Sequence, residues 1–325
     1  MHKFLQQKYI QMLMQLQEDL MNHLYFFLLS NIFFDIVDIN NNIKKCEKCE
    51  GKIIADPDTF DTWFSSSQWP FITLDYPAGK DFKDFYPTDV METASDILFF
   101  WVTRMIMLGL YRTGEVPFKN VYLHGVVRDK HGKKMSKSKG NVTNPIEITD
   151  QYGTDALRMS LVVANTPGTD TNLDTQKVLA YKKFANKLWN ITRFIMAETK
   201  SSTLKNKPPI TADDQKLLDE LSSFVKDTTD DMENMRFHLA SEKIYHYVWH
   251  RLADSLLEES KEILNDAEHS GLESRRWTLL YILSTSLKLL HPFMPFITEE
   301  IWEIMNKNDN DASLLIIEPW PKPLH

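Results

Sequence analysis

The sequence predicts an α/β part followed by an all-helical bundle. An apolar strand candidate at residues 121–127 runs directly into a strongly basic loop. From Asp174 onward, apolar residues recur three or four positions apart, which is the spacing of one helix face. No strand pattern appears in that half until residues 314–317, where we expect a short strand. A length of 325 residues fits two such domains.

Composition narrows the class of protein. The net charge of −8 argues against a protein wrapped in nucleic acid, although a local basic patch can still bind RNA. Two cysteines cannot form a disulfide framework, so we expect a reducing, cytoplasmic location. The N-terminus lacks a signal-peptide layout. The apolar run at residues 24–37 is too short and too polar to span a bilayer, so we expect no membrane association.

Residues 1–45 match no motif. Apolar spacing predicts a helix over residues 1–22. Cys46 and Cys49 then form one arm of a zinc knuckle, but a structural zinc site needs four ligands and no second arm exists. We therefore expect an empty, degenerate knuckle and no bound zinc or other protein-held metal.

A helix is expected over residues 95–112. It is apolar on nearly every face, which predicts that it is buried, and Gly114 should end it. A buried helix start offers free N–H groups and a partial positive charge. Asp96 lies at this start, where it could be a ligand contact or a simple cap.

The basic loop is the richest stretch for chemistry. Residues 128–139 hold six Lys or Arg and one Asp, and lysines supply point charges for phosphate oxygens. Charge alone would equally describe a solvated surface loop. Downstream, Asn144 and Pro145 form a strong helix start, Gly153 stops that helix, and residues 154–158 open the next one.

The residue order in this loop resembles a known signature. Lys134-Met135-Ser136-Lys137-Ser138 is the intact KMSKS signature of class I aminoacyl-tRNA synthetases. Further blocks resemble the valyl enzymes of that class, and they lie at residues 60–71, 86–90, 96–107 and 117–125. In the helical half, residues 184–190, 247–249 and 291–302 resemble the anticodon-binding bundle of class I enzymes.

The resemblance implies a fold and a reaction. Residues 46–170 would form the second half of a Rossmann-like, nucleotide-binding catalytic domain, and residues 171–325 an anticodon-binding bundle. That bundle would contain helices at residues 212–235, 239–264, 272–290 and 297–305. The implied activity is attachment of valine to tRNA(Val) through valyl-adenylate, with ATP and Mg²⁺.

The resemblance also implies site residues. Lys134 and Lys137 would stabilise pyrophosphate. The remaining ATP contacts would be Asp96, His124, Gly125, Met135, Ser136 and Ser138. Because ligands of open α/β sheets sit at the carboxyl ends of strands, we expect these residues on one sheet edge. The valine pocket would be lined by Trp63, Ile97 and Trp101, with plain packing as the alternative for Trp63.

One departure from the family matters. Ala94 stands where the family usually has Gly, which puts the placement of the ribose in question. Trp69 is expected to be an ordinary core residue.

The sequence contains neither a His-x-Gly-His motif nor a segment resembling the editing domain. We therefore expect a C-terminal half of a synthetase that is inactive alone and would need a separate N-terminal half as partner. The alternatives are a non-catalytic tRNA-binding module, an isoleucyl- or leucyl-type synthetase fragment, or another nucleotidyltransferase with a similar loop.

Overall fold

The computed structural model describes Lys45 and residues 50–52, 61–136, 140–163, 165–199, 204–307 and 313–324. It divides into two units, residues 1–60 and residues 61–325. The described feature of the first unit is an antiparallel bridge between Lys45 and Lys52. The helix expected over residues 1–22 and the pair Cys46 and Cys49 lie outside the described residues.

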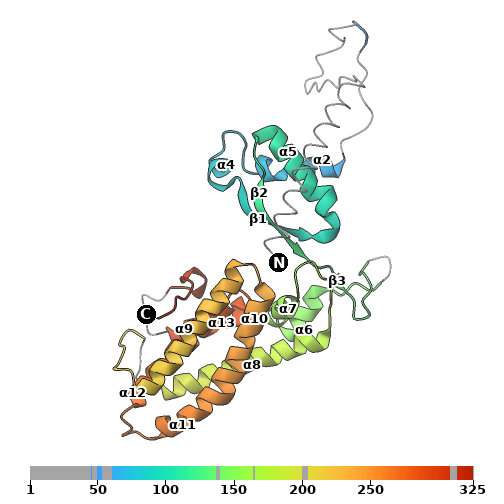
Figure 1. The fold of residues 1–325 in the computed structure, drawn as a ribbon. Coiled ribbons are helices and arrows are strands. Elements are labelled where there is room, and N and C mark those ends of the chain that lie inside the picture. The colour runs from blue at the N-terminus through green and yellow to red at the C-terminus, as the bar shows by residue number, and fades with distance from the viewer. Residues whose placement is uncertain are drawn as a thin grey trace, which may run out of the picture. The chain divides into compact units, whose positions relative to one another are not determined.

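The second unit begins with an α/β arrangement around a short parallel sheet (Figure 1). Its elements are α2 (Thr62–Ser67), α3 (Trp69–Ile72), α4 (Lys80–Phe85), β1 (Thr88–Ala94), η1 (Ser95–Ile97), η2 (Leu98–Val102), α5 (Thr103–Thr113) and β2 (Phe118–His124). Strand β1, which the apolar pattern did not predict, pairs in parallel with β2 from Thr88 opposite Phe118 to Ala94 opposite His124. The carboxyl ends of both strands therefore meet at one edge.

The segment expected as one helix over residues 95–112 is a 3₁₀ turn, a π turn and then α5. Gly114 ends it in the left-handed conformation at φ 83°, as expected. The prediction of burial on every face is wrong, because Phe99 is 71% exposed, Phe100 51% and Tyr111 86%. This part buries a core of four residues, Met91, Val102, Met105 and Phe118, which is too small to cover all the apolar side chains. Trp69, expected in the core, is 52% exposed for the same reason.

A second parallel pair follows, formed by β3 (Val127–Arg128) and β4 (Thr171–Asn172). Between them lie α6 (Pro145–Tyr152) and α7 (Thr154–Val162). The predicted helix start is confirmed: the Asn144 side chain accepts a hydrogen bond from the Ile146 N–H at 3.0 Å, and Pro145 is the first helical residue. Gly153, at φ 93°, separates the two helices.

The rest of the unit is helical, as predicted (Figure 1). Its elements are α8 (Thr175–Glu198), α9 (Ala212–Glu233), α10 (Phe237–His246), η4 (Tyr247–Leu256), α11 (Leu257–Asn265), α12 (Leu272–Leu290), α13 (Pro295–Met305) and η5 (Leu315–Ile317). The apolar stripe expected on α8 is buried, at Val178, Tyr181, Phe184, Leu188, Ile191 and Ile195. No helix in the described part of the chain is long and apolar enough to cross a membrane.

One continuous core joins these helices to α6 and α7. Ile148 of α6 and Met159 of α7 belong to the same cluster of buried residues as Phe184, Leu252 and Leu283. The helices that follow the basic loop therefore pack into the bundle rather than into the core around β1 and β2.

Two details of the bundle differ from expectation. The helix predicted over residues 239–264 changes to π geometry over Tyr247–Leu256 before α11 begins. The strand expected at residues 314–317 is wrong, because η5 is a 3₁₀ turn. The Glu299 carboxylate accepts hydrogen bonds from the N–H groups of Leu315 and Ile316 at 2.7 and 3.1 Å, which takes the place of strand pairing.

A buried ion pair connects the starts of α9 and α12. Asp214 pairs with Arg275, and their side chains are 1% and 7% exposed. Ser274 donates a second hydrogen bond to Asp214 and accepts one from the Thr211 N–H at 3.0 Å. The Arg275 guanidinium also donates to the Ser260 hydroxyl on α11 at 3.0 Å, so this one pair ties three helices together.

Removing one partner of this pair should destabilise the bundle strongly. Arg275→Ala leaves the Asp214 carboxylate buried without its counter-charge, which typically costs about 3–5 kcal/mol. Chemical denaturation of the chain measures the change in the free energy of unfolding. Lys216→Ala is the matched control: Lys216 pairs with Asp213 on the same helix, but both side chains are more than three-quarters exposed at 77% and 79%, so the midpoint should hardly move. Equal midpoints for the two variants would contradict this role.

Candidate functional site

The carboxyl edge of the β1–β2 sheet gathers three of the residues expected in the site. Asp96 lies two residues after β1, His124 ends β2, and Lys134 reaches back to this edge from the basic loop. The Lys134 ammonium is 3.4 Å from an Asp96 carboxylate oxygen. Their side chains are 64% and 49% exposed, so water screens the pair and a charged ligand could replace either partner.

Each ring nitrogen of His124 lies near an oxygen atom of the chain at this edge. Its Nε2 is 3.2 Å from the Glu92 carboxylate on the neighbouring strand, and its Nδ1 is 2.9 Å from the Gly125 carbonyl oxygen. Both ring nitrogens therefore already have partners in the chain. A nucleotide would meet the ring face of His124, or would have to displace one of these contacts.

Gly125 is required by the chain itself. A Cβ at this position would lie 1.7 Å from the carbonyl oxygen of Thr169, which is backbone and cannot swing aside. The segment after Thr169 is fixed alongside: Asp170 accepts hydrogen bonds from the Val126 N–H at 2.8 Å and from Arg128. These bonds, that of the Val126 amide first, hold the pKa of the Asp170 carboxyl below its usual value. The expected role of Gly125 as an ATP contact stays a prediction.

The base of the basic loop is closed by a pair of side chains that sequence reasoning missed. The Asn141 amide donates to the Asp129 carboxylate at 2.8 Å and accepts from the Ser136 N–H at 3.0 Å. Asp129 also accepts from the N–H groups of His131 and Lys133, both at 2.9 Å. The Asn141 hydrogen bond, followed by that of Lys133, lowers the pKa of the Asp129 carboxyl. In the sequence, the available signal for this closure was Asp129, the single acidic residue of the basic loop.

Of the five signature residues, three are described. Lys134 forms an antiparallel bridge with Arg128, and the Met135 sulfur accepts a hydrogen bond from the Thr143 N–H at 3.5 Å. Lys137 and Ser138 lie outside the described residues. Their expected contacts with ATP therefore stay predictions.

The residues expected to line the amino-acid pocket form two aromatic contacts rather than one. Trp63 lies beside Phe100, with ring centroids 6.5 Å apart. Trp101 lies beside Trp69 at 6.4 Å, and its indole N–H donates to the Ser66 carbonyl at 3.3 Å. Ile97 closes the 3₁₀ turn next to Asp96.

Helix α7 is locked to the bundle by polar contacts. The Asp155 carboxylate accepts hydrogen bonds from the N–H groups of Phe296 and Ile297 at the start of α13, at 3.2 and 2.7 Å. Burial raises the pKa of the Asp155 carboxyl. Arg158 donates to the Pro292 and Phe293 carbonyls at 3.0 and 3.3 Å. The chain leaving the basic loop is thus fixed to the end of the bundle.

The basic residues of α8 are not equally available to RNA. Lys177 donates to the Val163 carbonyl at 2.7 Å, and burial lowers the pKa of its ammonium. Lys182 donates to the Gln151 carbonyl, and Lys187 pairs with Asp254. Lys183 is exposed and has no ion-pair partner among the residues the structure describes.

The geometry supports anion binding at the sheet edge. Lys134 stands over the carboxyl ends of two parallel strands, and its present partner is a solvent-screened carboxylate. A loop whose base is closed by Asp129 and Asn141 can hold several lysines close together without a fixed partner for each. Such an arrangement can stabilise charge on a phosphate group.

Two family models match the chain. Residues 33–174 match the family described as tRNA synthetases class I (I, L, M and V). Residues 214–325 match the anticodon-binding domain of tRNA ligase. The first match begins within the segment 1–45, for which the sequence showed no motif.

Curated relatives are similar over most of the chain. It is 43% identical over 285 residues to a valine–tRNA ligase from Petrotoga mobilis and 42% identical over 284 residues to one from Clostridium tetani. Each alignment covers 86% of this chain but 32% of the relative. The chain therefore spans about a third of the length of the valine–tRNA ligases it matches.

Solved structures show the same fold. A leucyl-tRNA synthetase from Agrobacterium radiobacter K84, in a ternary complex with tRNA and LeuAMS, superposes with a TM-score of 0.70 at 25% identity, covering 86% of this chain and 35% of that one. A methionyl-tRNA synthetase from Mycobacterium tuberculosis, bound by methionyl-adenylate, superposes with a TM-score of 0.57 at 21% identity, covering 70% and 46%. The chain thus joins a fragment of the class I tRNA synthetase catalytic domain to the anticodon-binding domain of tRNA ligases, with its resemblance to valine–tRNA ligases running over most of its length.

Proposed function

We propose that this chain provides the pyrophosphate-binding half of the ATP site and the tRNA-binding bundle of a valine–tRNA ligase. The observation that carries the proposal is the position of Lys134, which lies 3.4 Å from Asp96 at the shared carboxyl edge of β1 and β2. The identity of 43% to a valine–tRNA ligase supports valine as the amino acid. Residues 46–170 would serve the nucleotide site and residues 171–325 the tRNA.

The reaction has two steps in this proposal. The valine carboxylate attacks the α-phosphorus of ATP, which forms valyl-adenylate and releases pyrophosphate. A hydroxyl of the tRNA terminal ribose then takes the valyl group and AMP leaves. No covalent enzyme intermediate is needed, so catalysis consists of positioning the reactants and stabilising charge.

The described residues would act mainly on charge and position. Lys134, together with Lys137, would stabilise the departing pyrophosphate once Lys134 exchanges its Asp96 contact for phosphate oxygens. Asp96 would then be available to the ribose hydroxyls, with His124 and Gly125 beside the adenine. Trp63, Ile97 and Trp101 would shape the valine pocket, and the backbone of Met135, Ser136 and Ser138 would approach the nucleotide.

Mg²⁺ has no resident site in this reading. No group of three His, Cys, Asp or Glu side chains in the described part of the chain could hold a metal ion. Mg²⁺ is commonly bound through substrate phosphates, so it would accompany the nucleotide. We assign it no step here.

The proposal includes a partner. Phe99 is 71% exposed and Tyr111 is 86% exposed, and both lie in the segment that follows β1, at residues 95–113. Large exposed apolar groups in one segment mark an interaction surface. We propose that the N-terminal half of a synthetase, which carries the His-x-Gly-His motif, covers them and completes the ATP site.

The main competing function is a non-catalytic tRNA-binding module. It would keep the bundle but would not need an intact KMSKS loop with its lysine at the sheet edge. Isoleucyl- and leucyl-type fragments are less well supported, because the valine–tRNA ligases reach 43% identity and the leucyl enzyme 25%. A different nucleotidyltransferase does not account for the anticodon-binding domain at residues 214–325.

The loop lysines should bind nucleotide phosphate by charge. Lys134→Ala and Lys137→Ala should each weaken ATP or pyrophosphate binding roughly 10-fold or more, because each removes a charge-assisted hydrogen bond. Isothermal titration of the folded variants measures this. Lys119→Ala is the matched control, since Lys119 is an exposed lysine near the opposite end of β2 that pairs with Asp89 at 2.7 Å. Binding that is unchanged in a loop variant would remove that lysine from the site.

Binding of tRNA by the bundle should release counterions from the RNA phosphates. The affinity of the chain for tRNA(Val) should fall steeply with salt, and Lys183→Ala should lower the slope of log K against log salt by about one. Lys187→Ala should change the slope much less, because the Lys187 ammonium is already paired with the Asp254 carboxylate at 2.6 Å. Filter binding at several salt concentrations distinguishes them. Affinity that is flat across salt, or no better than for an unrelated RNA hairpin, would favour a plain helical bundle.

A further inference from the structure

A groove runs along the bundle where α9, α10 and η4 meet. It has a volume of about 510 Å³. Phe224 and Tyr247 line it and are stacked, with ring centroids 4.2 Å apart and an interplanar angle of 11°. His246 and His250 line its wall and are themselves stacked, with centroids 5.5 Å apart and an angle of 21°.

The two imidazoles face solvent. The side chains of His246 and His250 are 56% and 57% exposed. A carboxylate one helical turn away lies near the edge of each ring. The distance is 3.9 Å from His246 Nε2 to the Glu242 carboxylate and 3.2 Å from His250 Nδ1 to the Asp254 carboxylate. These contacts use a ring edge. The two imidazoles also contact each other, and Tyr245 packs against His246 with ring centroids 5.3 Å apart, so a planar ligand would meet the ring surface that stays exposed.

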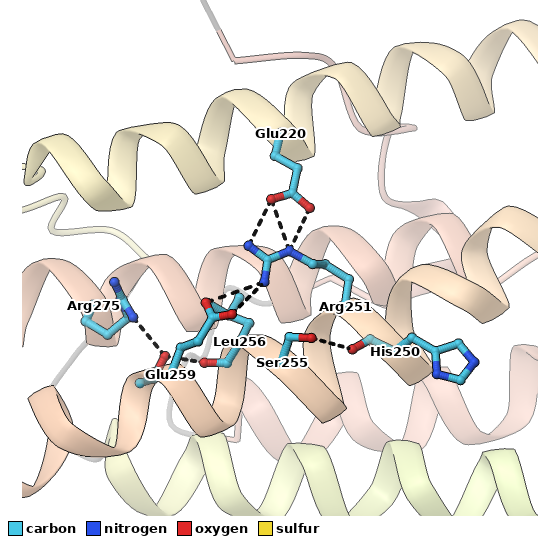
Figure 2. A network of polar contacts seen from close by, with 8 residues as sticks. Glu220, His250, Arg251, Ser255, Leu256, Glu259 and Arg275 are labelled. Carbon is cyan, nitrogen blue, oxygen red and sulfur yellow. Dashed lines mark hydrogen bonds and ion pairs between the residues drawn. The ribbon is translucent and has the colours of Figure 1, made fainter.

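The cations beside the groove are already neutralised. Arg251 pairs with Glu220 at 2.8 Å and with Glu259 at 3.4 Å, bridging two helices (Figure 2). Lys243 pairs with Asp231 at 2.6 Å. A phosphate would have to displace a carboxylate to reach either of them. The groove is therefore better suited to an uncharged ring than to a phosphate.

The helix that presents these histidines is locally unusual. Residues Tyr247–Leu256 form a π-helix, a rare geometry that often marks functional sites. The Ser255 hydroxyl donates to the His250 carbonyl at 3.3 Å within this widened turn (Figure 2). Figure 2 also shows the His250 ring directed away from the Arg251 network. The π segment thus carries the ion-paired Arg251 and, directed away from it, the exposed His250 imidazole, while His246 is the last residue of α10.

We propose that His246 and His250 form a stacking platform for an unstacked nucleobase of bound RNA. The inference rests on the proposed tRNA-binding function and identifies a surface for it. Aromatic side chains that stack bases are a general device for holding single-stranded RNA. RNA is favoured over a protein segment because the groove lies within residues 214–325, which match an anticodon-binding domain, and because its rings are flat and exposed.

The test uses the full chain and a tRNA(Val) transcript. His246→Ala and His250→Ala should each weaken binding by about 5-fold or more, which is the lower range for loss of one stacked base. The slope of log K against log salt should stay at the wild-type value, because no phosphate contact is lost. His246→Phe and His250→Phe should retain most of the affinity, since phenylalanine keeps a flat ring but no ring nitrogen.

His269→Ala is the matched control. His269 is an exposed histidine in the loop between α11 and α12, outside the groove, and its loss should not alter tRNA binding. Thermal melting of each variant confirms that the fold is kept.

Three outcomes would overturn the platform: wild-type affinity in the alanine variants, a salt slope lowered by about one, or phenylalanine variants as weak as the alanine ones. The first would remove the two histidines from the tRNA-binding surface. If the wild-type chain itself does not bind tRNA, the proposed function falls, and the platform falls with it.

Discussion

The close approach of Gly125 to Thr169 is the constraint on which the nucleotide edge depends. A backbone carbonyl occupies the place where a side chain at residue 125 would begin, 1.7 Å from the position of a Cβ. This contact lets β4 lie against β3, and Asp170 then holds Val126 and Arg128 from the other strand. The basic loop leaves β3 from this fixed base, so its lysines begin at a defined point above the sheet edge.

The far end of the same loop is anchored differently. After Asn141 the chain enters α6 and α7, whose buried side chains belong to the core of the bundle. Asp155 and Arg158 add polar contacts to the turn before α13 and to its first residues. The loop therefore connects two separate hydrophobic cores, one around β1 and β2 and one in the bundle.

Local signals predicted the helical half well. The stripe on α8 and the Asn144 cap involve residues close in sequence, so spacing and side-chain type were sufficient. The segment over residues 95–112 was harder. An all-apolar sequence indicates burial only when enough chain is present to cover it, and Phe99 remains 71% exposed here. The residues at 314–317 have strand-like composition, but Glu299 supplies their backbone partners and leaves a 3₁₀ turn.

In the candidate site, too, some features were predicted from the sequence and others were not. The KMSKS order, together with the rule that ligands bind at the carboxyl ends of strands, predicted that Asp96, His124 and Lys134 lie at one edge. The parallel register of β1 and β2 explains why they meet there. Strand β1 itself was not predicted, because its alternation is short and its acidic residues are typical of a surface segment. The closing role of Asn141 depends on a contact with Asp129 twelve residues earlier, and no periodicity reports such a contact. Whether Ala94 alters ribose placement stays a prediction.

We propose that this chain contributes one half of a valine-activating ATP site. Valine-dependent ATP–pyrophosphate exchange tests it most directly, measured with the chain alone, with a separately expressed N-terminal half of a valine–tRNA ligase alone, and with the two mixed. Exchange should appear only on mixing and should be lost when the chain carries Lys134→Ala, because the pyrophosphate-binding lysine comes from this half. Robust exchange by the chain alone would contradict this proposal. So would an active mixture whose exchange rate is the same with and without Lys134→Ala.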